Sequence, residues 1–107
     1  MSLAYFKGFK TYLSLERSLS PNTIIAYLHD VELLYLFLEK ETIQIKDVQL
    51  NHLQSFVQFV AEMDLNAASQ SRVISGVKSF FKFLLLEQII IEDPTELLQT
   101  PKLARPL

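Results

Sequence analysis

Hydroxyl, amide and basic side chains gather at two points of the chain where helices are predicted to begin. Ser20-Pro21-Asn22-Thr23 opens one stretch with apolar residues at helical spacing, and Ser69-Gln70-Ser71-Arg72 opens another. A helix N-terminus has free amide donors and the positive end of the helix dipole, so it suits phosphate binding. Each segment alone is better explained as a simple helix cap. The two together favour a surface that binds a phosphate backbone.

The second stretch, Ser69 to Leu86, separates into two faces at about 100° per residue. Arg72, Ser75, Lys78, Ser79 and Lys82 share the polar face, with Gly76 at its edge, and the stretch has three basic residues and no acidic one. This pattern fits either a solvated surface helix or a helix that lies against phosphates. The opposite face is apolar and is expected to anchor the fold; its members are Val73, Ile74, Val77, Phe80, Phe81, Leu84 and Leu85.

No group of residues in the sequence has the spacing of a catalytic, cofactor or metal site. The chain has no cysteine, no glycine-rich phosphate loop and no His-Glu-x-x-His motif. His29 and Asp30 are neighbours that point in different directions on a helix, so they form no dyad. His52 lies on another predicted helix. We therefore predict no catalytic residue, no cofactor and no metal.

Length and composition place the chain among small globular domains. It has 107 residues, half of them hydrophobic, with a formal net charge of −2. That charge argues against a generic nucleic-acid binder, which is normally basic. The positive charge is nevertheless concentrated between Ser69 and Leu86. Since no signal peptide and no long apolar run is present, a cytoplasmic protein without membrane contact is expected.

Apolar periodicity predicts an all-α domain of four helices, arranged as an orthogonal or bundle-like unit. Ser20 is expected to cap the second helix, Asp47 or Asn51 the third and Ser69 the fourth. Gly8 in the first helix marks either a close approach of another helix or nothing. The predicted ranges are Leu3 to Ser18, Pro21 to Lys40, Asp47 or Asn51 to Met63, and Ser69 to as far as Gln88.

Three segments resemble tyrosine recombinases of the Xer and phage-integrase type. Residues 19–31 resemble the family's "L-S-x-N-T-x-x-x-Y-x-x-D-L" segment, and residues 71–84 resemble its "R-x-x-S-x-x-R-x-F-F-x-F-L" helix. Residues 93–102 resemble its "N-P-x-x-x-L-x-x-P-K" exit into the catalytic domain. The order and spacing match over nearly the whole chain.

The resemblance implies an N-terminal core-binding domain, a SAM-like four-helix unit that forms half of a clamp around a recombination site on double-stranded DNA. Residues 1–93 would be this domain, and 94–107 an extended linker toward a C-terminal catalytic domain. The second and fourth helices would face the major groove, and the first would contact other recombinase protomers. The DNA-facing candidates carried over by position are Asn22, Thr23, Ala26, His29, Ser69, Ser71, Arg72, Ser75, Ser79 and Lys82.

The same resemblance implies that this chain cuts nothing, because the family's catalytic residues belong to the C-terminal domain. The full-length parent would be a DNA-cleaving and rejoining recombinase, acting in integration or resolution. The acidic net charge, and His29 where relatives often have arginine, imply few phosphate contacts and weak binding by an isolated, monomeric domain.

Two alternatives stay open at the level of sequence. SAM-like folds also serve as helical protein–protein interaction modules, and fold does not fix function. Leu33, Leu36 and Phe37 would then be the interface. A small enzyme is the more distant alternative.

Overall fold

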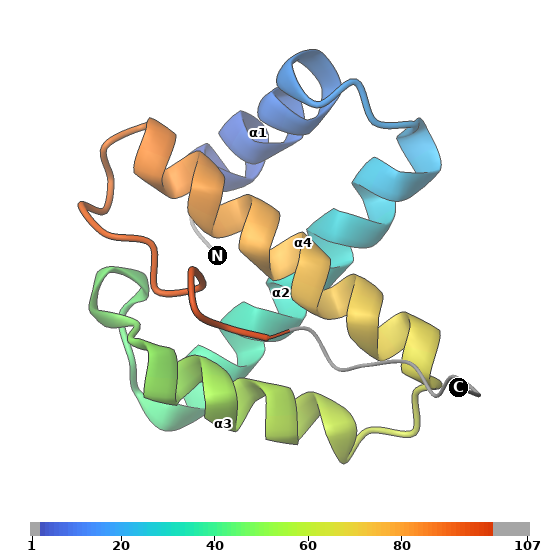
Figure 1. The fold of residues 1–107 in the computed structure, drawn as a ribbon. Coiled ribbons are helices and arrows are strands. Elements are labelled where there is room, and N and C mark those ends of the chain that lie inside the picture. The colour runs from blue at the N-terminus through green and yellow to red at the C-terminus, as the bar shows by residue number, and fades with distance from the viewer. Residues whose placement is uncertain (1–2, 100–107) are drawn as a thin grey trace.

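The chain folds into helices joined by short connections, with no strand among residues 3–99, which are the residues that the computed structural model describes. Side chains are described from Tyr5 onward. The all-α prediction is confirmed, and Figure 1 shows the arrangement. The four main helices are α1 (Leu3–Thr11), α2 (Pro21–Glu41), α3 (Leu50–Ala61) and α4 (Ala67–Leu86). A π-helical turn, Tyr12–Glu16, extends α1, and a 3-10 turn, Ile45–Asp47, precedes α3.

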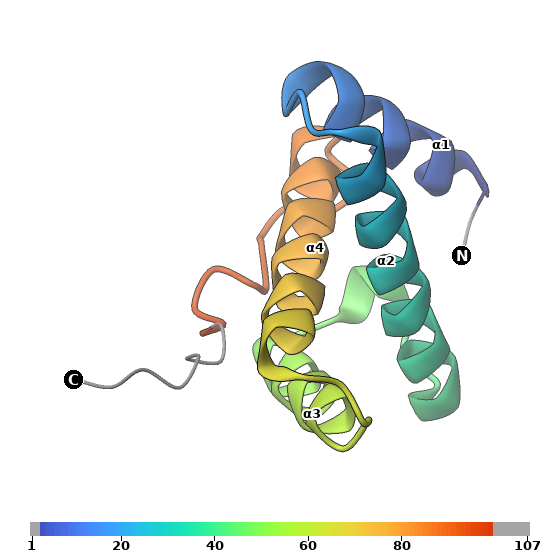
Figure 2. The same cartoon turned by 90° about the vertical axis from the view of Figure 1, so that its right-hand side faces the viewer.

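Helix α4 is the centre of the fold. It crosses α2 (Figure 1), with α1 on one side of the crossing and α3 on the other (Figure 2). Its buried residues include Gly76, Ser79 and Phe83 in addition to the predicted apolar face. Phe83 is 5% exposed, whereas Leu85, which we expected to be buried, is 39% exposed. The difference arises because α1 covers the side of α4 that carries Phe83.

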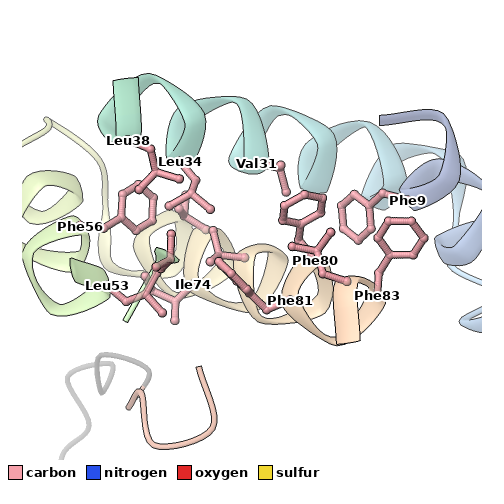
Figure 3. Packing of buried hydrophobic residues seen from close by; sticks show 14 of the residues in the cluster. Phe9, Val31, Leu34, Leu38, Leu53, Phe56, Ile74, Phe80, Phe81 and Phe83 are labelled. Carbon is pink, nitrogen blue, oxygen red and sulfur yellow. The ribbon is translucent and has the colours of Figure 1, made fainter. Parts of the chain in front are cut away.

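Aromatic side chains fill both ends of the α2–α4 contact (Figure 3). At one end the Phe9 ring packs on Phe80 and Phe83, with centroid distances of 5.1 and 5.8 Å. At the other end Phe37 packs on Phe56 and, at 5.3 Å, on a further phenylalanine of α3. Phe9, Phe56 and Phe80 are wholly buried. Burial of these rings supplies much of the hydrophobic stabilisation of the domain.

Of the three capping residues that were predicted, only the one for α2 is confirmed. Ser20 caps α2 as expected, because its hydroxyl accepts the Thr23 amide hydrogen. The other two capping predictions were wrong. Asn66 caps α4 by accepting the amide hydrogen of Ser69, so the helix starts earlier than expected. Gln49 is the N-cap of α3, and its amide donates to Nδ1 of His52.

The packed unit continues past the end of α4. Thr95 and Leu98 are buried, and Asp93 Oδ1 accepts hydrogen bonds from both the amide and the hydroxyl of Thr95. Residues 94–99 of the predicted linker therefore lie on the domain, and the domain boundary itself stays a prediction. The linker from Thr100 and its Pro101-Lys102 motif fall outside the described residues. No helix in the described part of the chain has the length and hydropathy to span a membrane.

Candidate nucleic-acid interface

Arg72 and Asp30 form an ion pair across the α2–α4 contact. Arg72 Nη2 donates to Asp30 Oδ1 at 2.8 Å, and Nε donates to Oδ2 at 3.2 Å. The Asp30 side chain is 2% exposed, whereas that of Arg72 is 44% exposed. Burial raises the pKa of the Asp30 carboxyl, and the hydrogen bonds and charge of Arg72 oppose that rise. Arg72 is thus held at the surface by a buried partner.

Gly76 makes room for this pair. A Cβ atom at position 76 would lie 2.9 Å from Asp30 Oδ2 and 3.2 Å from Cδ1 of Tyr27. These distances are too short for an ordinary contact, so a side chain at position 76 would force Asp30 or Tyr27 to move. The residue that was expected at the edge of a polar face is buried where Asp30 and Tyr27 of α2 pack on α4.

Ser79 does not lie on the surface that the sequence assigned to it. Its side chain is buried, and its hydroxyl accepts a hydrogen bond from Arg17 Nη1 at 3.2 Å. The prediction that Ser79 faces a groove is therefore wrong for this structure. Arg17, which precedes α2 and is exposed, was missed because it belongs to no periodic pattern. Its position among polar residues directly before the Ser20 cap was the available signal.

One outward row on α4 remains. Ser71, Ser75, Lys78 and Lys82 follow one another at i, i+4, i+7 and i+11, which places them on a single stripe of the helix. Lys82 is exposed and the other three are partly exposed. Lys78 was on the predicted polar face but was not among the predicted DNA-facing residues. Its place in this row adds it to them.

A matching row lies on α2. Asn22, Ala26 and His29 are spaced i, i+4, i+7; Asn22 and His29 are exposed and Ala26 is partly exposed. In each helix the residue of the ion pair directly follows a member of the row: Asp30 follows His29, and Arg72 follows Ser71. Helices α2 and α4 cross in contact with each other (Figure 1), and the Asp30–Arg72 pair joins them beside the two rows. We call the two rows the α2–α4 face.

The two remaining predicted residues lie at helix starts. The Thr23 hydroxyl is 3.0 Å from that of Ser20, at the N-terminus of α2. Ser69 is partly buried in the first turn of α4, where its amide is bonded to the Asn66 cap. Both therefore flank the α2–α4 face as parts of the helix caps.

The α2–α4 face presents hydroxyl, amide and basic side chains at exposed or partly exposed positions. Lys78, Lys82 and Arg17 add positive charge, while Arg72 is balanced by Asp30. Ser71 and Ser75, which precede the lysines in the row, are small and would allow a ligand to approach the helix backbone. Within residues 3–99, no three His, Asp or Glu side chains gather as metal ligands would.

The alternative interface on α2 is not continuous. Phe37 is 5% exposed because it packs between α2 and α3, and Leu33 is partly buried. Leu36 is the one exposed residue of the three. The expectation of an exposed Leu33–Leu36–Phe37 patch is therefore wrong at Phe37.

Comparison with known proteins places the chain beside site-specific recombinases. The family described as "Phage integrase, N-terminal SAM-like domain" matches residues 6–88. The tyrosine recombinase XerD of Rhizobium meliloti is 36% identical over 107 residues, which is all of this chain and 34% of that protein. A tyrosine recombinase of Pseudothermotoga lettingae is 36% identical over 101 residues, covering 92% of this chain and 35% of the relative.

A third relative extends the similarity to the other Xer type. The tyrosine recombinase XerC of Leptospira interrogans serovar Lai is 33% identical over 100 residues, or 92% of this chain and 32% of the relative. The chain thus spans about a third of the length of the curated relatives that it matches.

Proposed function

The chain belongs to the family of phage integrase N-terminal SAM-like domains, and we propose that it is the DNA-binding domain of a site-specific tyrosine recombinase. In this proposal it holds double-stranded DNA at a recombination site, while a separate catalytic domain cuts and rejoins the strands for integration or resolution. The observation that carries the proposal is the α2–α4 face, where two crossing helices present small, hydroxyl and basic side chains at exposed or partly exposed positions.

The face has features that suit a major groove. The groove is about 12 Å wide and admits a helix. Lys78 and Lys82 would bind phosphates, as Arg17 would near the start of α2. Ser71, Ser75 and Ala26 are small enough for the helix backbones to approach the groove. At the start of α2, Pro21 has no N–H and the amides of Thr23 and Ile24 donate to Ser20, so the Asn22 amide is the donor that a phosphate would use.

Affinity of the chain alone is expected to be low. Its net charge is −2, and the positive charge of Arg72 is offset by Asp30, so few counterions would be released on binding. In the full-length recombinase, other protomers on the DNA would add contacts through α1. A groove of about 440 Å³ between α1 and the end of α4, bordered by the exposed Leu15 and Leu86, supports that part of the proposal.

Fluorescence anisotropy with a labelled mixed-sequence DNA duplex, titrated at several salt concentrations, tests the proposal. Lys78→Ala and Lys82→Ala should each weaken binding and lower the slope of log K against log salt by about one. Lys46→Ala is the matched control, because Lys46 is exposed in the turn before α3 and belongs to neither row. A folded chain that binds no duplex at the lowest salt would show the proposal to be wrong.

A further inference from the structure

The Arg72–Asp30 ion pair, which has no net charge, joins the two helices of the α2–α4 face. Asp30 accepts hydrogen bonds from Nε and Nη2 of Arg72, which together form one edge of the guanidinium. A guanidinium has five N–H donors, so the edge formed by Nη1 and Nη2 keeps a parallel pair of donors. Because Asp30 is buried and Arg72 is half exposed, only the arginine presents polar atoms to a ligand.

The ion pair leaves Arg72 with hydrogen-bond donors for a ligand but with little net positive charge. A carboxylate fixed beside the guanidinium cancels most of the attraction that Arg72 would exert on a phosphate. The free donors stay available, and guanine presents two acceptors, O6 and N7, in the major groove at the spacing of an arginine fork. An arginine held in this way is suited to a base edge more than to the DNA backbone.

Gly76 leaves room for the Asp30 carboxylate between the two helices. Any side chain at position 76 would collide with Asp30, so the glycine admits the carboxylate to the helix contact. Two hydrogen bonds to a buried acceptor also fix the plane of the guanidinium, which reduces the conformational entropy that Arg72 loses on binding.

Building on the proposed function, we infer that Asp30 is a positioning residue that holds Arg72 to read a guanine in the major groove, in place of a phosphate contact. Asp30 itself touches no DNA. Arg72 then contributes sequence preference, and Lys78 and Lys82 contribute affinity.

Two measurements test this division. Base preference is read by sequencing duplexes that the chain selects from a pool of random sequence, and charge is read from the salt slope on one mixed-sequence duplex. Asp30→Asn frees the Arg72 charge, so the slope should steepen by about one while preference for guanine at one position falls about tenfold. Arg72→Lys keeps the charge balance but lacks the fork. It should lose the same preference with an unchanged slope.

Glu32→Gln is the matched control, because Glu32 is an exposed carboxylate on the same helix. It should leave base preference unchanged. Arg72→Lys still offers Asp30 a cation, so it remains informative if Asp30→Asn is poorly folded by circular dichroism.

The outcomes separate the inference from the proposed function. If the wild-type chain binds duplexes with the salt slope expected of its lysines, but both variants keep its base preference, the inference alone is wrong. A wild-type chain that binds without any base preference also overturns the inference. A folded wild-type chain that binds no duplex removes the proposed function, and the inference with it.

Discussion

The chain has two glycines, and both lie where α4 meets another helix. Gly8 on α1 faces the Phe83 ring, and a Cβ there would come 2.8 Å from Cζ of that ring. Gly76 on α4 faces Asp30, whose carboxylate is held by Arg72. One contact is aromatic and the other is polar, although a Cβ at either glycine would come similarly close to the facing side chain.

The Gly8 and Gly76 contacts differ in how easily the facing side chain can shift. The tip of the Phe83 ring can shift without the loss of a hydrogen bond, although the ring packs on Phe9, Tyr12 and Phe80. The Asp30 carboxylate is fixed by two directional hydrogen bonds and has no access to water. The polar contact should therefore tolerate change less well than the aromatic one, because a buried charge that loses its partner keeps its full desolvation cost.

Removal of Arg72 should have the largest effect on stability. Arg72→Ala leaves the Asp30 carboxylate buried and unpaired, so the free energy of unfolding should fall by about 3 kcal/mol. Urea denaturation followed by circular dichroism measures the change. A loss below about 1 kcal/mol would place the pair among ordinary surface ion pairs.

The same variant should show a pH dependence of known sign. Burial raises the pKa of Asp30 above its ordinary 3.8, and Arg72→Ala removes the main opposing influence. A carboxyl with a raised pKa favours the folded state at low pH, and this contribution is lost as pH rises through the raised pKa. The loss of stability should therefore be smallest below pH 3.8 and should grow as pH rises. Asp30→Asn/Arg72→Ala should abolish that trend.

Gly76→Ala comes next in size. The new methyl group would displace Asp30 or Tyr27, and overpacking of this kind costs about 2 kcal/mol. Alanine's higher helix propensity offsets part of the cost. The variant's urea midpoint, compared with that of wild type, gives the net effect; a variant as stable as wild type would mean that α2 and α4 separate easily.

Tyr35 has a buried hydroxyl among the aromatic side chains that pack on α4. Its ring packs on Phe80, but its hydroxyl is buried with no hydrogen-bond partner among the described residues. Tyr35→Phe should raise the free energy of unfolding by about 1 kcal/mol, since no hydrogen bond is lost. Thermal denaturation at neutral pH measures this gain, and a clear loss would indicate a partner for the hydroxyl.

Alkaline pH separates the same variant from wild type. Burial, with a smaller influence from Tyr5, raises the pKa of Tyr35 above its ordinary 10.0. A raised tyrosine pKa contributes stability that is complete below pH 10.0 and declines above it. Tyr35→Phe should therefore lose less stability than wild type in alkaline buffer.

Gly8→Ala should have the smallest effect. The new methyl group requires the tip of the Phe83 ring to shift, and alanine gains about 1 kcal/mol of helix propensity, so the net change should stay within about 1 kcal/mol. Parallel denaturation of the Gly8→Ala and Gly76→Ala variants makes the comparison direct. Equal losses in the two would remove the distinction between the aromatic and the polar contact.

Local signals predicted the helices and their starts well. Ser20 and Pro21 fix the start of α2 through a cap and a ring that suits the first helical position, and both effects act within one turn. The start of α4 was misplaced because Asn66 and Ser69 are both good caps, and the sequence does not say which one the chain uses. The π-helical turn at Tyr12–Glu16 had no signal in the pattern at all.

The sequence predicted most of the residue types of the candidate site, but not how their side chains are arranged. Helical periodicity correctly grouped Ser75 and Lys82 on an outward stripe. It also grouped Arg72 and Ser79 with them, although these two turn toward α2 and Arg17. A helical period gives the angle between residues on one helix, but it does not say where the neighbouring helix lies.

The sequence by itself determined that this chain is an all-α domain of the phage integrase N-terminal SAM-like family, with a basic stretch between Ser69 and Leu86. Those properties depend on local propensity, periodicity and motifs. The tertiary structure alone decided that Arg72 is paired with Asp30, that Ser79 is buried, and that Phe83 rather than Leu85 enters the core. Each of these depends on partners 42 or more residues away, or on which side of α4 the first helix covers.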